Sequence, residues 1–194
     1  VLTLEYIDGT KISDIDELLA RGIDPNAVAQ LMTEAFCEQV LVHGFFHADP
    51  HPGNVFYLPG NRLAFIDFGM VGRLSNRRRE ELLQLLLGLV EKQPQAVADV
   101  LLEWTGDQPH SVQLSQLEEE IQAFVEEHHG TPMAQLHLGQ MLAQVTTILR
   151  EHRLALPADL ALLIKAFISL EGMGGQLDPD FHMTTEAMPL LRHV

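Results

Sequence analysis

The chain has 194 residues, of which 46% are hydrophobic and 20% are charged. This length fits one domain, or one large lobe with an appendage, and the composition excludes a disordered or collagen-like chain. The formal net charge of −15 comes from 12 basic and 27 acidic residues, and a field of this sign argues against general binding to nucleic acid.

The cysteine content and the hydropathy of the chain indicate its cellular compartment. The single cysteine, Cys37, cannot form an internal disulfide, which favours a reducing compartment. No uninterrupted run of 18 apolar residues and no secretory signal pattern occur. We therefore expect a cytoplasmic protein without a membrane span, whose contact with a membrane would be peripheral at the surface.

The alternating residues 1–7 predict a strand that closes at the turn pair Asp8–Gly9. Because the chain opens with Val1 and directly in this strand, we expect that further sequence precedes it. A short helix capped by Ser13 or Asp14 should follow, and then a longer helix. Asp24 and Pro25 are typical of the first cap and first turn of that longer helix, which we expect to end near His43–Gly44.

The eight residues His47–Asn54 (HADPHPGN) contain two prolines and one glycine. Such a segment fits neither a helix interior nor a central strand, so it predicts a loop. A strand at 55–57, a turn at Pro59–Asn61 and a return strand at 63–66 predict a hairpin. Asp67–Phe68–Gly69 follows the return strand at once.

From about residue 75 onward the pattern is helical, with breaks expected at prolines and at the segment Gly172–Gly175. We therefore predict a mainly α fold with a small β-hairpin region. Residues 1–75 would hold the opening strand, two helices, the loop and the hairpin, and residues 76–194 the helical remainder. The expected helices of this remainder are 76–92, 94–104, 113–129, 133–152, 158–171 and 184–192.

The chemistry-bearing residues concentrate in 47–69. Asp49, Asn54 and Asp67 carry the hard oxygen donors that Mg²⁺ prefers, and the hairpin should return Asp67 to the end of the sheet that holds Asn54. The five-residue step from Asp49 to Asn54, followed by Asp-Phe-Gly, matches the H-x-D-x-x-x-x-N and D-F-G elements of protein kinases. In that template the first Asp orients the attacking hydroxyl, and the Asn and the second Asp hold Mg²⁺.

These residues also resemble the UbiB-type atypical kinases, a family linked to ubiquinone biosynthesis. The form H-x-D-P-H-P-G-N at His47–Asn54 is particular to that family. The opening Leu4–Gly9 resembles its hinge strand, and the segments 165–172 and Leu177–Pro179 are similar to its C-terminal helices. The likeness covers nearly the whole chain.

The resemblance implies a protein-kinase-like C-terminal lobe with extra C-terminal helices that binds ATP and Mg²⁺ and acts as an ATPase or lipid-related kinase. Ala48 stands where regulated protein kinases carry an arginine, and only about eight residues separate Asp67 from the next helix. Both features argue against protein substrates. The hinge residues whose backbone would meet the adenine are Glu5, Tyr6 and Ile7.

The kinase-type N-terminal lobe, with its phosphate-covering loop and strand-borne lysine, has no counterpart in this sequence. We therefore expect the chain alone to bind Mg-nucleotide weakly and to turn over little. The partners implied by the resemblance are an N-terminal lobe, membrane lipid and quinone-pathway proteins.

Other interpretations stay open at this point. The Asp and Asn residues of 47–69 could serve only as turn residues that satisfy backbone groups. His47 is expected to support the loop backbone, whereas His51 could contact a phosphate or metal. Together with Asp49 and Asp67, these histidines could also form a transition-metal site.

The arginines at 77–79 predict either a solvated face paired with Glu80 and Glu81, or a contact with anionic lipid headgroups. Two rival functions also remain. Small-molecule kinases of the aminoglycoside or choline type carry a similar H-x-D-x-H-x-G-N loop, and a nucleotide-binding scaffold without turnover would fit the same motifs.

Overall fold

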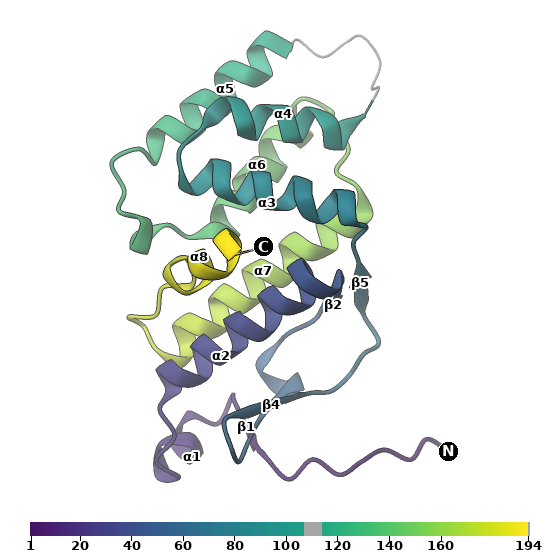
Figure 1. Cartoon of the computed structure of the whole chain (residues 1–194), viewed down its shortest axis with the longest axis vertical. Helices are drawn as coiled ribbons and strands as arrows, with labels where there is room; N and C mark the ends of the chain where they lie inside the picture. The colour runs from purple at the N-terminus through teal and green to yellow at the C-terminus, as the bar shows by residue number, and fades with distance from the viewer. Residues whose placement is uncertain (107–113, 194) are drawn as a thin grey trace.

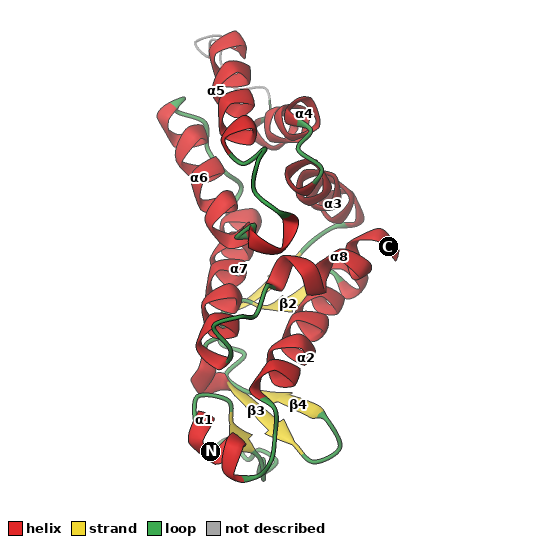
Figure 2. Cartoon of the chain, turned by 90° about the vertical axis from the view of Figure 1, so that its left-hand side faces the viewer, coloured by secondary structure: helices red, strands yellow, loops and turns green. Residues whose placement is uncertain are grey.

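The computed structural model describes residues 1–106 and 114–193. Most of these residues are helical, and the strands form two small antiparallel sheets. Figure 2 shows β3 and β4 gathered at one end of the molecule and helices α3 to α6 at the other. The predicted mainly α fold with a small hairpin region is therefore confirmed.

The first helices begin where their capping residues predict. In α1 (Ile15–Ala20), a side-chain oxygen of Asp14 accepts the Glu17 backbone N–H at 3.1 Å. In α2 (Pro25–Cys37), Asp24 does the same for the Asn26 N–H at 3.0 Å, and Pro25 occupies the first turn. Each cap satisfies an N–H group that has no partner inside its helix.

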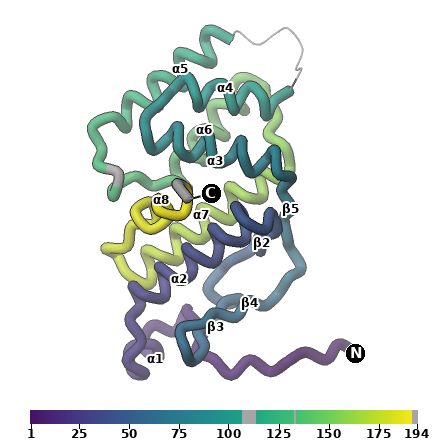
Figure 3. The backbone as a smooth tube through the Cα atoms, in the orientation of Figure 1, coloured from purple at the N-terminus to yellow at the C-terminus, as the bar shows by residue number. Residues whose placement is uncertain are grey.

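The predicted opening strand is wrong. Residues 1–8 have no regular secondary structure, and the first strand, β1, is only Thr10–Lys11. Figure 3 shows this opening segment running out from the body of the fold. Leu2, Leu4 and Tyr6 are exposed, and no strand within the described ranges pairs with their backbone.

The end of the second helix is confirmed, but its form was not predicted. After Cys37 the helix widens into a π-helix, Glu38–His43, and ends at Gly44 in the left-handed region with φ 62°. A glycine is needed there because a side chain would be strained at this φ and its Cβ would lie 2.6 Å from the Leu74 carbonyl oxygen.

The predicted hairpin is present. Strand β3 (Val55–Leu58) pairs with β4 (Arg62–Phe65), with Val55 opposite Phe65, and β1 pairs with the other edge of β3. A second pair, β2 (Phe45–His47) with β5 (Val71–Arg73), was not predicted from the sequence. Its effect is to draw together the segments before and after the loop-and-hairpin region.

The remaining chain forms helices that largely follow the predicted pattern. The predicted helix 133–152 is instead a short 3₁₀ turn at Met133–Gln135 followed by α6, and residue 113, where another helix was expected to begin, lies outside the described residues. The observed helices are α3 (Asn76–Val90), α4 (Pro94–Thr105), α5 (Leu114–Glu127), α6 (Leu138–Glu151), α7 (Ala158–Leu177) and α8 (Met183–His193).

Helix α7 continues through the glycines at 172–175, where a break was predicted. Gly174 serves close packing there, because a Cβ at this position would lie 2.6 Å from the Phe181 ring. Figures 1 and 2 show α7 beside α2, and Phe36 and Phe167 join the two helices edge to face at 5.2 Å. By length and composition α7 is also a candidate membrane span, although half of that apolar window is buried within the fold.

Candidate active site

The loop His47–Asn54 connects β2 to β3 through a short 3₁₀ turn, Pro52–Asn54. At its start, the Ala48 N–H donates to the Met70 carbonyl at 3.1 Å. At its end, the Ile66 N–H donates to the Asn54 carbonyl at 2.9 Å. These two backbone bonds hold the loop against the segment that carries Asp67.

His47 is the buried centre of this arrangement, with 1% of its surface exposed. Its Nδ1 accepts the Asp49 backbone N–H at 3.1 Å, and its Nε2 lies 2.8 Å from the Ile66 carbonyl oxygen. Because Nδ1 accepts, the hydrogen-bond pattern assigns the neutral tautomer with its proton on Nε2. One imidazole therefore joins the residue before Asp67 to Asp49.

Two further bonds close the loop on itself. The Asn54 side-chain amide donates to the Asp49 carbonyl at 3.2 Å, and the Asn54 backbone N–H donates to the His51 carbonyl at 2.9 Å. His51 Nδ1 accepts the Gly53 N–H at 2.9 Å. With its prolines limiting the backbone further, this loop keeps little conformational freedom to lose when a ligand binds.

Asp67 adopts the left-handed region with φ 60° and is exposed. Asp and Asn tolerate this conformation better than most residues. The Gly69 N–H lies 3.4 Å from Asp67 Oδ1, and Phe68 packs near His47, with ring centroids 5.1 Å apart. Asp67 is therefore solvent-accessible at this turn.

The backbone locks the loop while three oxygen-bearing groups stay free. Among residues 1–106 and 114–193, no hydrogen bond or ion pair engages the Asp49 carboxylate, the Asn54 side-chain oxygen or the second Asp67 oxygen. Carboxylate and amide oxygens are the hard donors that Mg²⁺ prefers in proteins. The roles of these three residues stay predictions, and so does the phosphate or metal role of His51.

The transition-metal interpretation is not supported. No three His, Cys, Asp or Glu side chains converge to hold a metal in the part of the chain that the structure describes. Both ring nitrogens of His47 are already engaged, and Nδ1 of His51 is used by the loop. The predicted hinge residues Glu5, Tyr6 and Ile7 lie in the opening segment, outside the strands, and their role at the adenine stays a prediction.

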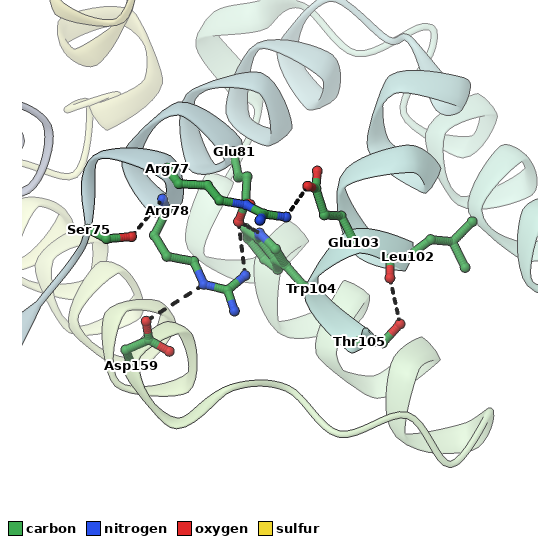
Figure 4. Close-up of polar contacts among 9 residues, drawn as sticks. All are labelled: Ser75, Arg77, Arg78, Glu81, Leu102, Glu103, Trp104, Thr105 and Asp159. Carbon is green, nitrogen blue, oxygen red and sulfur yellow. Dashed lines mark hydrogen bonds and ion pairs between the residues drawn. The ribbon is translucent and has the colours of Figure 1, made fainter. Parts of the chain in front are cut away.

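Sequence reasoning missed a polar cluster around a buried carboxylate, shown in Figure 4, that engages two of the three arginines at 77–79. Glu81 is only 4% exposed. It accepts hydrogen bonds from Arg77 at 2.7 Å, Arg78 at 2.9 Å and the Trp104 indole N–H at 2.9 Å. We call these four residues the Glu81 cluster.

The Glu81 cluster joins three helices. Arg77 also binds Glu103 of α4, and Arg78 lies 4.0 Å from Asp159 of α7. Burial disfavours the Glu81 charge, but the Arg77 and Arg78 hydrogen bonds outweigh it and hold the pKa of Glu81 below its ordinary value. The expected pairing with Glu81 is present, and Arg77 and Glu80 are exposed as a solvated face requires, whereas Arg78 and Arg79 are half-buried.

Two of the tail residues that resemble the UbiB family make hydrogen bonds to other parts of the fold. Glu171 of α7 accepts the Gly139 N–H at 2.7 Å and so caps the start of α6. Asp178 accepts the Asn26 side-chain amide at 2.6 Å and the Asp180 N–H at 3.0 Å, and these bonds lower the pKa of Asp178. Both residues fix the C-terminal helices to the body of the fold.

Comparison with known proteins places these features in a family context. Residues 1–101 match the ABC1 atypical kinase-like domain, and residues 121–182 match the UbiB helical domain. Similar proteins include the uncharacterised protein sll1770 of Synechocystis, 34% identical over 97% of this chain and 32% of that protein. The Arabidopsis thaliana protein ACTIVITY OF BC1 COMPLEX KINASE 7, chloroplastic, is 35% identical over 97% of this chain and 27% of that protein.

The chain therefore spans about a third or less of the length of these curated relatives. A solved structure with a similar fold is Rv3197 of Mycobacterium tuberculosis in complex with erythromycin. Its TM-score is 0.56 at 21% sequence identity, covering 96% of this chain and 48% of that one.

Proposed function

Because the chain belongs to the ABC1 family of atypical kinase-like proteins, we propose that it binds ATP with Mg²⁺ through the loop at 47–54 and Asp67. The single observation that carries the proposal is the locked loop backbone with unengaged side-chain oxygens on Asp49 and Asn54 and one unengaged oxygen on Asp67. A purely structural turn cluster would instead use these oxygens to satisfy backbone groups.

In this proposal the three residues have separate tasks. Asn54 and Asp67 hold Mg²⁺, which when bound offsets charge on the phosphates. Asp49 accepts a hydrogen bond from the attacking water or alcohol and orients it. His47 keeps both sides of the site in register through its bonds to Asp49 and Ile66.

We further propose that the acceptor is water or a small or lipid-like molecule. The segment after Asp67 pairs at once as β5, and α3 begins at Asn76. Little chain is left there to form the docking segment that protein kinases place between D-F-G and A-P-E. A phosphotransferase or ATPase linked to ubiquinone biosynthesis fits this description.

The activity, partners and location of the whole protein belong to the same proposal, since the chain spans only part of its relatives. An N-terminal lobe would cover the nucleotide from the other side and would strengthen binding. Membrane lipid and quinone-pathway proteins are the partners that a lipid-related substrate implies, with the protein peripheral at the membrane surface.

The test is a calorimetric titration of Mg-ADP into the chain alone and into the chain extended by an N-terminal lobe. Asp67→Asn should weaken Mg-dependent binding by at least about tenfold, the loss typical of removing even an outer partner of a metal ligand. The matched control is Asp180→Asn, which removes an exposed carboxylate and should leave binding unchanged.

Three outcomes matter. Mg-dependent binding that Asp67→Asn abolishes supports the site, and phosphate release by the extended chain supports an enzyme. Binding without turnover in the extended chain would favour a nucleotide-binding scaffold. If neither form binds Mg-ADP, or if both variants behave alike, the proposed function is wrong.

A further inference from the structure

The π-helix Glu38–His43 lies between α2 and the loop and has no task in the function proposed so far. Such widened turns are rare and often occur beside functional sites. Here the Gly44 N–H donates to the Gln39 carbonyl, five residues earlier, which closes the last wide turn. Gln39 is thus fixed at the turn that leads into β2.

The Gln39 side chain makes a second contact with the same segment. Its Oε1 accepts the His47 backbone N–H at 2.9 Å. The next N–H, that of Ala48, points to the opposite side and bonds Met70, as alternation along a strand requires. Gln39 therefore satisfies the edge of β2 that faces away from β5, at a residue that is itself buried.

The π-helix is held in place from α3. The Arg79 guanidinium donates to the carbonyls of Leu41, at 2.9 Å, and Val42. Carbonyls at a helix end have no partner within the helix, so an arginine that binds two of them stabilises the end in this form. The third arginine of 77–79 thus has a structural task, as the first two have.

These contacts form a chain of hydrogen bonds from the π-helix to both sides of the site. Gln39 bonds the His47 N–H, and the His47 ring bonds the Asp49 N–H and the Ile66 carbonyl. Displacement of the His47 backbone would move its ring. The loop that carries Asp49 and Asn54 would then lose its register with Asp67.

We propose that Gln39 is a positioning residue for the Mg-nucleotide site, acting through His47 and touching neither nucleotide nor metal. This inference rests on the proposed function. Loss of the Gln39 side-chain acceptor leaves the loop free to adopt arrangements that cannot bind, and apparent affinity falls with the fraction that remains competent.

The experiment compares three variants by Mg-ADP titration, urea unfolding and hydrogen exchange of the His47 amide. Gln39→Leu removes the acceptor, whereas Gln39→Glu keeps an acceptor oxygen at the same reach. Gln30→Leu is the matched control, since Gln30 lies on the preceding helix α2 and loses one side-chain bond, to Glu186 at 3.3 Å, far along the chain from the loop.

We expect Gln39→Leu to weaken Mg-ADP binding about fivefold, the equilibrium equivalent of one neutral hydrogen bond. Protection of the His47 amide should fall with it. Gln39→Glu should restore both properties, and Gln30→Leu should leave both unchanged while lowering the urea midpoint about as much as Gln39→Leu does.

The inference is overturned if Gln39→Leu binds Mg-ADP like the parent chain while Asp67→Asn does not. It is also overturned if Gln39→Glu fails to rescue binding, or if Gln30→Leu weakens binding equally, because a general loss of stability would then explain the effect. If even Asp67→Asn changes nothing, the proposed function itself fails.

Discussion

The molecule contains two concentrations of polar side chains that are held in opposite ways. In the loop at 47–54, backbone bonds and one buried imidazole fix the chain while the oxygens of Asp49 and Asn54 stay free. In the Glu81 cluster, side chains bind side chains, and Glu81 uses both of its oxygens. The first arrangement leaves donors for a ligand, and the second uses them up within the fold.

This difference shows that charge density alone does not identify a site. The arginines at 77–79 form the densest basic stretch of the chain, yet their partners are internal. The loop has fewer charges, but the Asp49 carboxylate has no hydrogen-bond or ion-pair partner among the residues that the structure describes. We therefore expect the two regions to respond oppositely to substitution, the Glu81 cluster in stability and the loop in binding.

The largest stability effect is expected in the Glu81 cluster. Glu81→Ala leaves Arg78 and the buried Trp104 N–H without their shared acceptor, so the free energy of unfolding should fall by about 2–3 kcal/mol. Urea unfolding measures this fall in the free energy of unfolding. The control Glu80→Ala removes an exposed neighbour and should change stability by less than about 0.5 kcal/mol, and equal losses in both variants would break the comparison.

Acid should weaken the same cluster. Because the folded-state pKa of Glu81 is lowered, its contribution is complete above the ordinary carboxyl value of 4.5. It is lost as the pH falls through the lower folded value. We expect Glu81→Gln to lose less stability than the parent chain between about pH 6 and about pH 3, as followed by urea midpoints. Parallel pH profiles would contradict this assignment.

A smaller loss is expected where α2 meets the end of α7. Asn26→Ala removes the amide that binds Asp178 at 2.6 Å. The carboxylate keeps its Asp180 N–H bond, so the loss of stability should be clearly smaller than that of Glu81→Ala. Thermal unfolding would measure this loss of stability. Asn61→Ala is not a suitable control, because Asn61 has a positive φ and its replacement would change the backbone as well.

The smallest stability effect is expected in the loop. Asp49→Asn removes a charge that no neighbouring group in the described ranges neutralises, so stability should change by less than about 0.5 kcal/mol. The same variant should abolish any phosphate release by the extended chain. A large loss of stability would mean that the carboxylate is a structural group and that the contrast with Glu81 is mistaken.

Much of the fold and of the candidate site could be predicted from the sequence, because the signals that mark them are local. The caps Asp14 and Asp24 act within three residues, and the prolines of the loop exclude regular structure on their own. The spacing of Asp49, Asn54 and Asp67 likewise depends on one loop and one hairpin. Sequence reasoning therefore found the segment that the structure closes into a compact loop.

What could not be predicted depends on partners distant in the chain. Glu103 lies 26 residues from Arg77, and nothing local marks it as that arginine's partner. Gly174 resembles a helix break until the Phe181 ring against it is known. The opening strand was inferred from alternation, the turn pair Asp8–Gly9 and a resemblance at Leu4–Gly9, whereas a strand also requires a neighbouring strand that the described chain does not supply.

The most direct test of the central claim is to locate the metal. Mn²⁺ takes oxygen ligands as Mg²⁺ does, and its paramagnetism broadens the NMR signals of nearby amides. With ADP present, a small amount of Mn²⁺ should first broaden the amides of Asn54 and Gly69. Broadening centred instead on the acidic groove between α3 and α4, lined by Glu91, Asp99 and Glu103, or spread evenly over the molecule, would contradict the account.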